Sequence, residues 1–213
     1  MKITIIYDNE VYEKGLEADW GFSCLIDRED TTRILFDTGA NGSILLSNME
    51  ALGIQPRTIN EIFISHSHWD HTGGLHDFLK KKDATKIYVP ASLPKPRGAR
   101  EAVSVDGSLQ IHENIFSTGE LRGIEQSLVV RTGKGLVVIV GCSHPGVKSI
   151  LNAASQFGRV YALIGGLHGF REFDRLRDLK LICPCHCTQF KSEIRSLYPN
   201  KCVEGGAGKV IEV

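Results

Sequence analysis

One run of six residues, His66 to His71, constrains this chain more than any other part of its sequence. It reads His-Ser-His-Trp-Asp-His and follows residues 61–65, a mainly apolar run that predicts a buried strand ending here. In an extended or tightly turned segment alternate side chains share a face, so His66 and His68 can hold one metal ion while Asp70 and His71 turn towards a second. The run therefore predicts a metal site at a strand end.

The residue types of this run indicate which ions it would bind. Neutral imidazoles suit zinc, iron or manganese, and a neighbouring carboxylate can hold a second ion or handle the proton of a bound water. We therefore expect one or two divalent metal ions as cofactors, with zinc favoured and manganese or iron as the alternatives.

Three further histidines stand beside glycine, proline or cysteine at predicted strand ends. They are His144 in Gly-Cys-Ser-His-Pro-Gly, His168 in Gly-Gly-Leu-His-Gly and His186 in Pro-Cys-His-Cys-Thr. We expect them to join the same site. His76 and His112 lack such a context and are expected to be ordinary surface or core residues.

Composition limits the classes of protein to consider. The chain has 213 residues, 42% of them hydrophobic, which suits a single domain spanning residues 1–213. Lys and Arg number 25, as do Asp and Glu, so no global charge favours nucleic acid or a membrane surface. We expect a cytoplasmic protein, because the polar N-terminus does not resemble a signal peptide and no apolar run could span a membrane. Its cysteines are expected to be reduced.

The hydrophobic pattern alternates between short strands and helices. Strands are expected at residues 2–7, 22–27, 32–36, 62–65, 86–89, 108–112, 115–117, 127–131, 136–141, 160–164, 180–183 and 209–212. Helices are expected at residues 44–52, 75–81, 146–156, 172–178 and 189–196, the first of them capped by Asn41 and ended by Gly53. Two β-rich halves that each finish with helices predict an αββα sandwich, with two facing sheets covered by helices.

Residues 90–105 stand apart from this pattern. They contain prolines, a glycine and three basic side chains, Lys95, Arg97 and Arg100, and we expect an irregular loop or lid. Such a lid could present the three cations to a phosphate or carboxylate of the substrate. A solvated loop without a role is the alternative.

The order of these motifs resembles that of the metallo-β-lactamase superfamily. Asp37 in Ile-Leu-Phe-Asp-Thr-Gly matches the first motif, residues 66–71 followed by Thr-Gly-Gly the second, and His144, the His168 region and His186 the last three. The later motifs are similar to those of the dihydropterin-ribofuranosylaminobenzene-phosphate synthase-like metal-dependent hydrolases. The resemblance strengthens the expected αββα sandwich and implies that all ligand loops meet along one edge.

The resemblance also implies how the ligands are shared between two ions. The first ion would be held by His66, His68 and His144, and the second by Asp70, His71 and His186. Asp37 would not be a ligand but would accept a hydrogen bond from a ligand imidazole or a loop amide. The alternative for Asp37 is an ordinary turn residue.

His168 departs from the superfamily pattern, in which much of the family has an aspartate that bridges both ions. Because an imidazole nitrogen cannot bridge in the same way, His168 either binds one ion terminally or faces the substrate as a hydrogen-bond donor. The ligand role is favoured, because the position matches that of a superfamily ligand and Gly165 and Gly166 allow a close approach of the backbone.

These features predict a metal-dependent hydrolase or group-transfer enzyme. A metal-bound hydroxide would act on a small, possibly phosphorylated or pterin-like substrate, with Asp70 orienting it and passing a proton to the leaving group. Cys142 and Ser143 are expected to pack rather than react. The alternatives are a non-enzymatic metal or pterin-binding module, an RNA-processing nuclease of the same superfamily and, least favoured, a β-lactamase.

Overall fold

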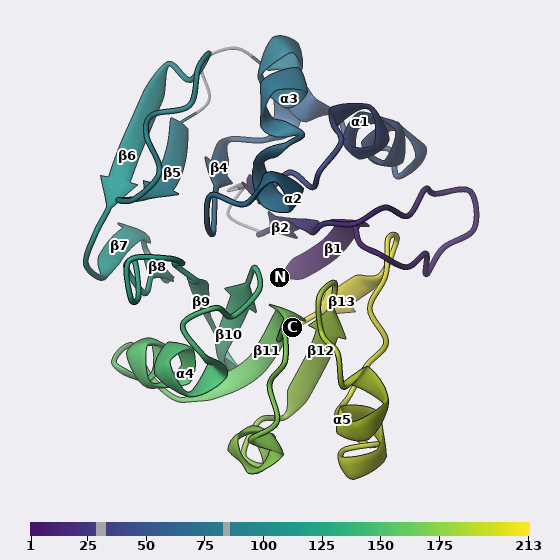
Figure 1. Ribbon diagram of the computed structural model, residues 1–213, viewed down its shortest axis with the longest axis vertical. Helices are drawn as coiled ribbons and strands as arrows, with labels where there is room; N and C mark the ends of the chain where they lie inside the picture. The colour runs from purple at the N-terminus through teal and green to yellow at the C-terminus, as the bar shows by residue number, and fades with distance from the viewer. Residues whose placement is uncertain (29–32, 83–85) are drawn as a thin grey trace.

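Two mixed β-sheets face each other in the computed structural model, which describes residues 1–28, 33–82 and 86–213 (Figure 1). The first sheet has seven strands in the order β13-β1-β2-β3-β4-β5-β6, and the second has six in the order β12-β11-β10-β9-β8-β7. The first sheet contains β1 (Lys2–Tyr7), β2 (Ser23–Asp27), β3 (Arg33–Phe36), β4 (Glu61–Phe63), β5 (Lys86–Pro90), β6 (Glu101–Val105) and β13 (Val210–Glu212). The second contains β7 (Leu109–His112), β8 (Ile115–Ser117), β9 (Leu128–Thr132), β10 (Gly135–Val140), β11 (Val160–Gly166) and β12 (Leu181–Cys185).

Helices cover the outer face of each sheet, which confirms the expected αββα sandwich. The helices over the first sheet are α1 (Gly42–Ala51), α2 (Trp69–Thr72) and α3 (Leu75–Lys81), with a 3₁₀ turn, η1 (Pro56–Thr58). Those over the second sheet are α4 (Val147–Ser155) and α5 (Lys191–Leu197), with a second 3₁₀ turn, η2 (Phe173–Leu176). The Asn41 side chain caps α1 by accepting from Ser43 N at 2.9 Å, as its sequence predicted.

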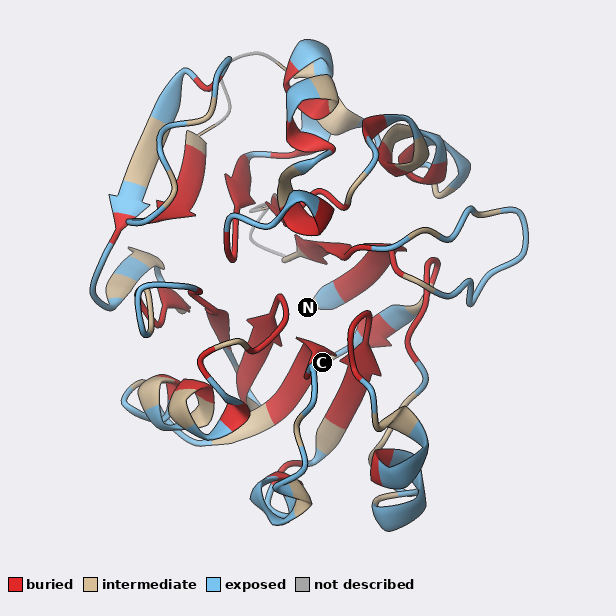
Figure 2. Cartoon of the chain, viewed as in Figure 1, coloured by how far each residue is buried: buried red, intermediate tan, exposed pale blue. Residues whose placement is uncertain are grey.

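Strand β10 shows why the pattern of apolar residues produces this layered arrangement. Val137 and Ile139 belong to the core between the two sheets, whereas Leu136, Val138 and Val140 belong to the core beneath the outer helices. Because alternate side chains point to opposite faces, a continuous apolar run buries both faces of the strand. Figure 2 shows the result, with largely buried strands and helices exposed on their outer side.

The carboxyl ends of parallel strands bring the predicted site together. β3 pairs with β4 in parallel, as β10 does with β11 and β11 with β12. Asp37 follows β3, the His66 run follows β4, and His144, His168 and His186 follow β10, β11 and β12. Parallel strands end on the same edge of a sheet, so all of these residues lie at one edge of the sandwich.

Two expected elements differ from the structure. Residues 90–105 are not irregular throughout, because Glu101–Val105 form β6, which pairs in parallel with β5 from Lys86↔Glu101 onwards. The prolines end before β6 begins, and pairing with β5 supplies the backbone hydrogen bonds of this edge strand. The helix expected at residues 172–178 is shortened to η2, a 3₁₀ turn. Thr32, the first residue of one expected strand, lies outside the described residues.

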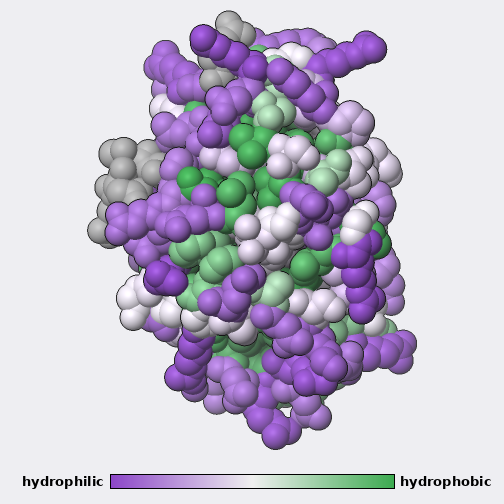
Figure 3. All heavy atoms as spheres, turned by 90° about the vertical axis from the view of Figure 1, so that its left-hand side faces the viewer, coloured by the Kyte–Doolittle hydropathy of each residue, from purple (hydrophilic) through white to green (hydrophobic). Residues whose placement is uncertain are grey.

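The core reaches the surface between the two edge strands β6 and β7. Val103, Leu109 and Ile111 are partly buried and pack against the core between the sheets. Figure 3 views this side, at the left in Figure 1, where hydrophobic side chains gather between hydrophilic regions. Among the described residues, every helix falls short of the length and apolar character that a membrane crossing needs.

Candidate metal centre

The structure brings His66, His68 and His144 together as one triad. Their ligand nitrogens all lie within 4.8 Å of one another. The ring centroid of His66 is 4.6 Å from that of His68 and 4.9 Å from that of His144. This spacing suits one transition metal bound by three imidazoles, which is the set that the resemblance implies for the first ion.

A second triad, Asp70, His71 and His186, adjoins the first. Its ligand atoms also lie within 4.8 Å of one another, and Asp70 Oδ2 is 3.3 Å from His186 Nε2. Asp70 and His71 are on the short helix α2, whereas His186 follows β12. The rings of His66 and His71 are 4.2 Å apart, so the two triads form one continuous centre.

The ligand histidines are oriented through their second ring nitrogen. The contacts are Ser65 Oγ to His66 Nδ1 at 2.9 Å, Asp37 Oδ2 to His71 Nδ1 at 2.7 Å and Asn9 Oδ1 to His186 Nδ1 at 2.8 Å. An imidazole held in this way presents Nε2 to a metal. Among the described residues, the buried Nε2 atoms of His66, His144 and His186 have no hydrogen-bond partner. Because buried polar atoms are rarely left unpaired, these atoms fit a metal centre.

Asp37 lies where the sequence placed it and contacts more than one neighbour. Its carboxylate accepts from Ser65 N at 2.7 Å and from Ser65 Oγ at 2.6 Å, in addition to its contact with His71. Complete burial raises the pKa of this carboxyl group. Asp37 therefore supports one residue of each triad, His71 directly and His66 through Ser65.

Burial also sets the protonation state of the ligand imidazoles. Desolvation is the largest cause that lowers the pKa of His66 and of His71, and neighbouring imidazoles add to it. Both rings are therefore held neutral, which is the form that binds a metal ion.

Four residues of the site adopt positive φ angles. Asp37 has φ 51°, Ser143 62°, His168 47° and His186 46°. Such angles are uncommon for residues other than glycine and often accompany functional sites. Here each marks a sharp turn within three residues after a strand, at the edge of the sandwich where the two triads lie.

Glu125 is a site residue that sequence reasoning missed. Its Oε1 accepts from the backbone N–H groups of Gly141, Cys142 and Ser143 at 3.0 to 3.1 Å, and its Oε2 from His144 N at 2.9 Å. Burial raises the pKa of Glu125 to about 7, against these backbone hydrogen bonds. A single buried carboxylate thus holds the loop that carries His144, yet no local motif marks it.

The segment after β1 also reaches the second triad, which the sequence did not indicate. Asp8 accepts from His186 N at 3.1 Å. Trp20 donates its indole N–H to Asp70 Oδ2 at 2.9 Å, and its ring lies 5.2 Å from that of His186. These partners are distant in sequence from the residues that they hold, and no local spacing relates them.

His168 lies beside the centre rather than within it. It is absent from all four candidate ligand groups found among the described residues, although its ring is 5.2 Å from that of His144. His168, which is exposed, and His144, which is half-buried, line a cavity of about 530 Å³. The same cavity is lined by Arg122, Lys148 and Arg171. The structure therefore does not assemble His168 with either triad, and its role stays a prediction.

Lys95, Arg97 and Arg100 are exposed, and they neither belong to a candidate ligand group nor line the cavity beside His144. Lys95 Nζ donates to Arg100 O at 3.2 Å, and Arg100 immediately precedes β6. The start of β6 pairs with the start of β5, whereas the ligand loops follow the other ends of the strands. The crossover between two parallel strands must return the chain to the far edge, so these residues are not assembled with the centre.

The family follows from comparison with known proteins. Residues 21–166 match the metallo-beta-lactamase superfamily, and the chain belongs to that family. The membership that the sequence motifs suggested is thereby confirmed.

Three known proteins are similar to this chain in sequence or in fold. The 7,8-dihydropterin-6-methyl-4-(beta-D-ribofuranosyl)-aminobenzene-5'-phosphate synthase of Methanocaldococcus jannaschii is 29% identical over an alignment that covers 89% of this chain and 88% of the relative. The crystal structure of Tm1679, a metal-dependent hydrolase of the beta-lactamase superfamily, is 27% identical with a TM-score of 0.79, covering 100% of this chain and 99% of that one. YhfI from Bacillus subtilis shares the fold at 15% identity and a TM-score of 0.70, covering 99% of each chain. The family and the named synthase support a metal-dependent enzyme.

Proposed function

We propose that this protein is a metal-dependent hydrolase or group-transfer enzyme that acts on a small phosphorylated substrate. The observation that carries the proposal is that the buried Nε2 atoms of His66, His144 and His186 make no hydrogen bond and each lie beside other candidate ligand atoms. Two triads with oriented imidazoles fit two divalent ions, with zinc favoured and manganese or iron as alternatives.

The chemistry divides between the ions and the side chains around them. Divalent ions in such a site lower the pKa of a bound water and polarise the carbonyl or phosphoryl oxygen under attack. Asp70 would help to hold one ion, orient the attacking water and pass a proton to the leaving group, and its Oδ2 accepts the indole N–H of Trp20 at 2.9 Å. His168 donates a hydrogen bond to the substrate from the wall of the cavity.

Charge in the cavity beside His144 favours an anionic substrate. Arg122, Lys148 and Arg171 line it, against a single acidic side chain, Glu172. The Arg171 guanidinium is 4.3 Å from the centre of the Phe190 ring, a contact that fixes its position. Guanidinium and ammonium groups bind phosphate through charge-assisted hydrogen bonds. The phosphate in the name of the Methanocaldococcus relative is consistent with this substrate class.

An activity screen tests the proposed function. Phosphodiesters, lactones, thioesters and pterin precursors would be offered with Zn²⁺, Mn²⁺ and Fe²⁺, and we expect turnover of at least one anionic substrate that is lost on metal removal. A binding module would instead show no turnover, and adding a thiol or phosphonate inhibitor would leave the spectrum of the bound metal unchanged.

Two triple variants locate the substrate anion. Replacement of Arg122, Lys148 and Arg171 by alanine should lower kcat/KM by about tenfold or more, equivalent to roughly 1.4 kcal/mol. The matched control replaces Lys95, Arg97 and Arg100, which also removes three cations, and should leave kcat/KM unchanged. If instead only the variant lacking Lys95, Arg97 and Arg100 shows a lower kcat/KM, the substrate anion binds at the segment before β6.

The variant His168→Ala separates the two roles considered for this residue. On the substrate side, its loss should leave the metal content unchanged while kcat falls by roughly a hundredfold or more. A ligand would instead give at least about tenfold weaker binding of one ion, with activity partly restored by excess metal.

A further inference from the structure

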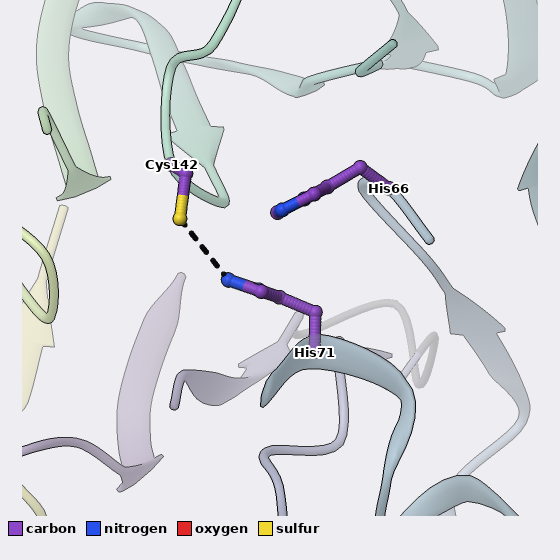
Figure 4. Close-up of side chains that lie close together, drawn as sticks. All are labelled: His66, His71 and Cys142. Carbon is purple, nitrogen blue, oxygen red and sulfur yellow. Dashed lines mark hydrogen bonds between the residues drawn. The ribbon is translucent and has the colours of Figure 1, made fainter. Parts of the chain in front are cut away.

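Cys142 stands in the loop between β10 and α4 and points at the metal centre. Its side chain is buried, and its Sγ is 3.2 Å from His71 Nε2. Figure 4 shows the Cys142 thiol, from the loop after β10, beside the rings of His66 and His71, which come from the run after β4. Simple packing, the role expected from sequence, does not require a sulfur aimed at the metal-facing nitrogen of an imidazole.

Two candidate ligand groups share this sulfur. Cys142 lies within 4.8 Å of His66 and His71 in one group, and of His186 and Cys187 in another. The Nε2 atoms of His66 and His186 make no hydrogen bond, and these residues are only 1% and 3% exposed. The thiol therefore occupies the same small volume as the buried nitrogens for which a metal ion is the fitting partner.

The charge of the ligand set gives an independent reason for another anionic ligand. Among the described residues, the four candidate groups contain one carboxylate, that of Asp70. Five neutral imidazoles and one carboxylate would leave two divalent ions largely uncompensated in a buried site, which is unfavourable. A thiolate supplies a second negative charge and is a preferred ligand of zinc.

We infer that Cys142 Sγ is a fourth protein ligand of the ion held by Asp70, His71 and His186, on the side that faces His66. This inference rests on the metal centre of the proposed function. The S–H bond breaks when the metal–sulfur bond forms, and the proton passes to solvent without any change of oxidation state. A thiolate at this position also selects zinc, cobalt or iron over manganese, which prefers oxygen ligands.

Cys187 is the competing thiol and provides the matched control. It is buried and belongs to one of the same groups, but no hydrogen bond from its sulfur to an imidazole ligand of either triad is found among the described residues. Its sulfur lies against the backbone, 3.9 Å from Cys142 O. The contact of Cys142 Sγ with His71 Nε2, which Cys187 lacks among the described residues, favours Cys142 over Cys187 as the ligand.

Spectroscopy of the cobalt-substituted protein tests the inference without an activity assay. The full chain loaded with Co²⁺ should show a near-ultraviolet thiolate-to-cobalt charge-transfer band. The band should persist in Cys187→Ala and disappear in Cys142→Ala and Cys142→Ser, with cobalt still bound by the histidine triads. The two Cys142 variants should also bind the second equivalent of Zn²⁺ at least about tenfold more weakly while their affinity for Mn²⁺ changes less.

The outcomes separate this inference from the proposed function. Cobalt bound at both positions without the band in the unmodified chain would overturn the Cys142 assignment and leave the histidine centre intact. Loss of the band in Cys187→Ala alone would assign the ligand to Cys187. Failure of the unmodified chain to bind any metal would overturn both. The spectrum of the unmodified chain by itself shows whether a thiolate binds the metal, so poor folding of a variant does not prevent the test.

Discussion

At the scale of the residue, the centre depends on how each imidazole is oriented and kept neutral. Asp37, Ser65 and Asn9 hold the Nδ1 side of three ligand histidines, so that their Nε2 atoms face inwards. The clustering of His144 and His186 with the His66 to His71 run was predictable, because that run is close in sequence and the later histidines stand at strand ends. Asn9 was not, because it is 177 residues away from His186 in the chain.

The buried, neutral state of His66 predicts a pH-dependent contribution to stability. Its pKa in the folded protein is far below the ordinary value of 6.5, so the unfolded chain binds the extra proton at acid pH. The contribution is fully present above pH 6.5 and is lost as the pH falls below that value. In metal-free protein, the free energy of unfolding of His66→Asn relative to the unmodified chain should rise by about 1.4 kcal/mol between pH 7.5 and pH 5.5.

Urea unfolding at the two pH values measures this change. Comparing the variant with the unmodified chain removes the contributions of the buried carboxyl groups Asp37 and Glu125, which have the opposite sign because their pKa values are raised. An unchanged difference between the two proteins would show that the folded state protonates His66 as readily as the unfolded chain.

At the scale of the element, the site is a set of loops that follow parallel strands. Strands with a continuous apolar run, such as β10, were predicted within a residue or two because their apolar pattern is local. β6 was missed because prolines dominate its surroundings and only its pairing with β5 defines it. The loop after β10 also depends on tertiary contacts, since Gly141 lies so close to Ser65 and His66 that a methyl group there would collide with both.

Glu125 provides the test at this scale, because one carboxylate holds four consecutive N–H groups of that loop. Glu125→Ala should lower the free energy of unfolding by about 3 kcal/mol, since buried donors lose their acceptor. It should also weaken the binding of the ion held by the first triad, because His144 is no longer held in place. The exposed Glu113→Ala is the control. Equal stability and equal metal affinity in the two variants would show that Glu125 does not support the site.

At the scale of the whole molecule, the sandwich fold creates a centre that neither half of the chain contains alone. The first triad combines the loop after β4 in one sheet with the loop after β10 in the other, and the second combines α2 with the loop after β12. Because ligands from both sheets must meet, metal binding and the packing of the two sheets are coupled. The residues with the least local sequence signal, Glu125, Asn9 and Trp20, maintain this meeting point.

The metal content of the purified protein tests the central claim most directly. Elemental analysis should find more than about half an equivalent of transition metal in the unmodified chain, and most of it should be absent from the double variant His66→Ala/His68→Ala. The exposed helix variant His76→Ala should retain the full content. Full metal occupancy in the double variant would contradict the assignment of the centre.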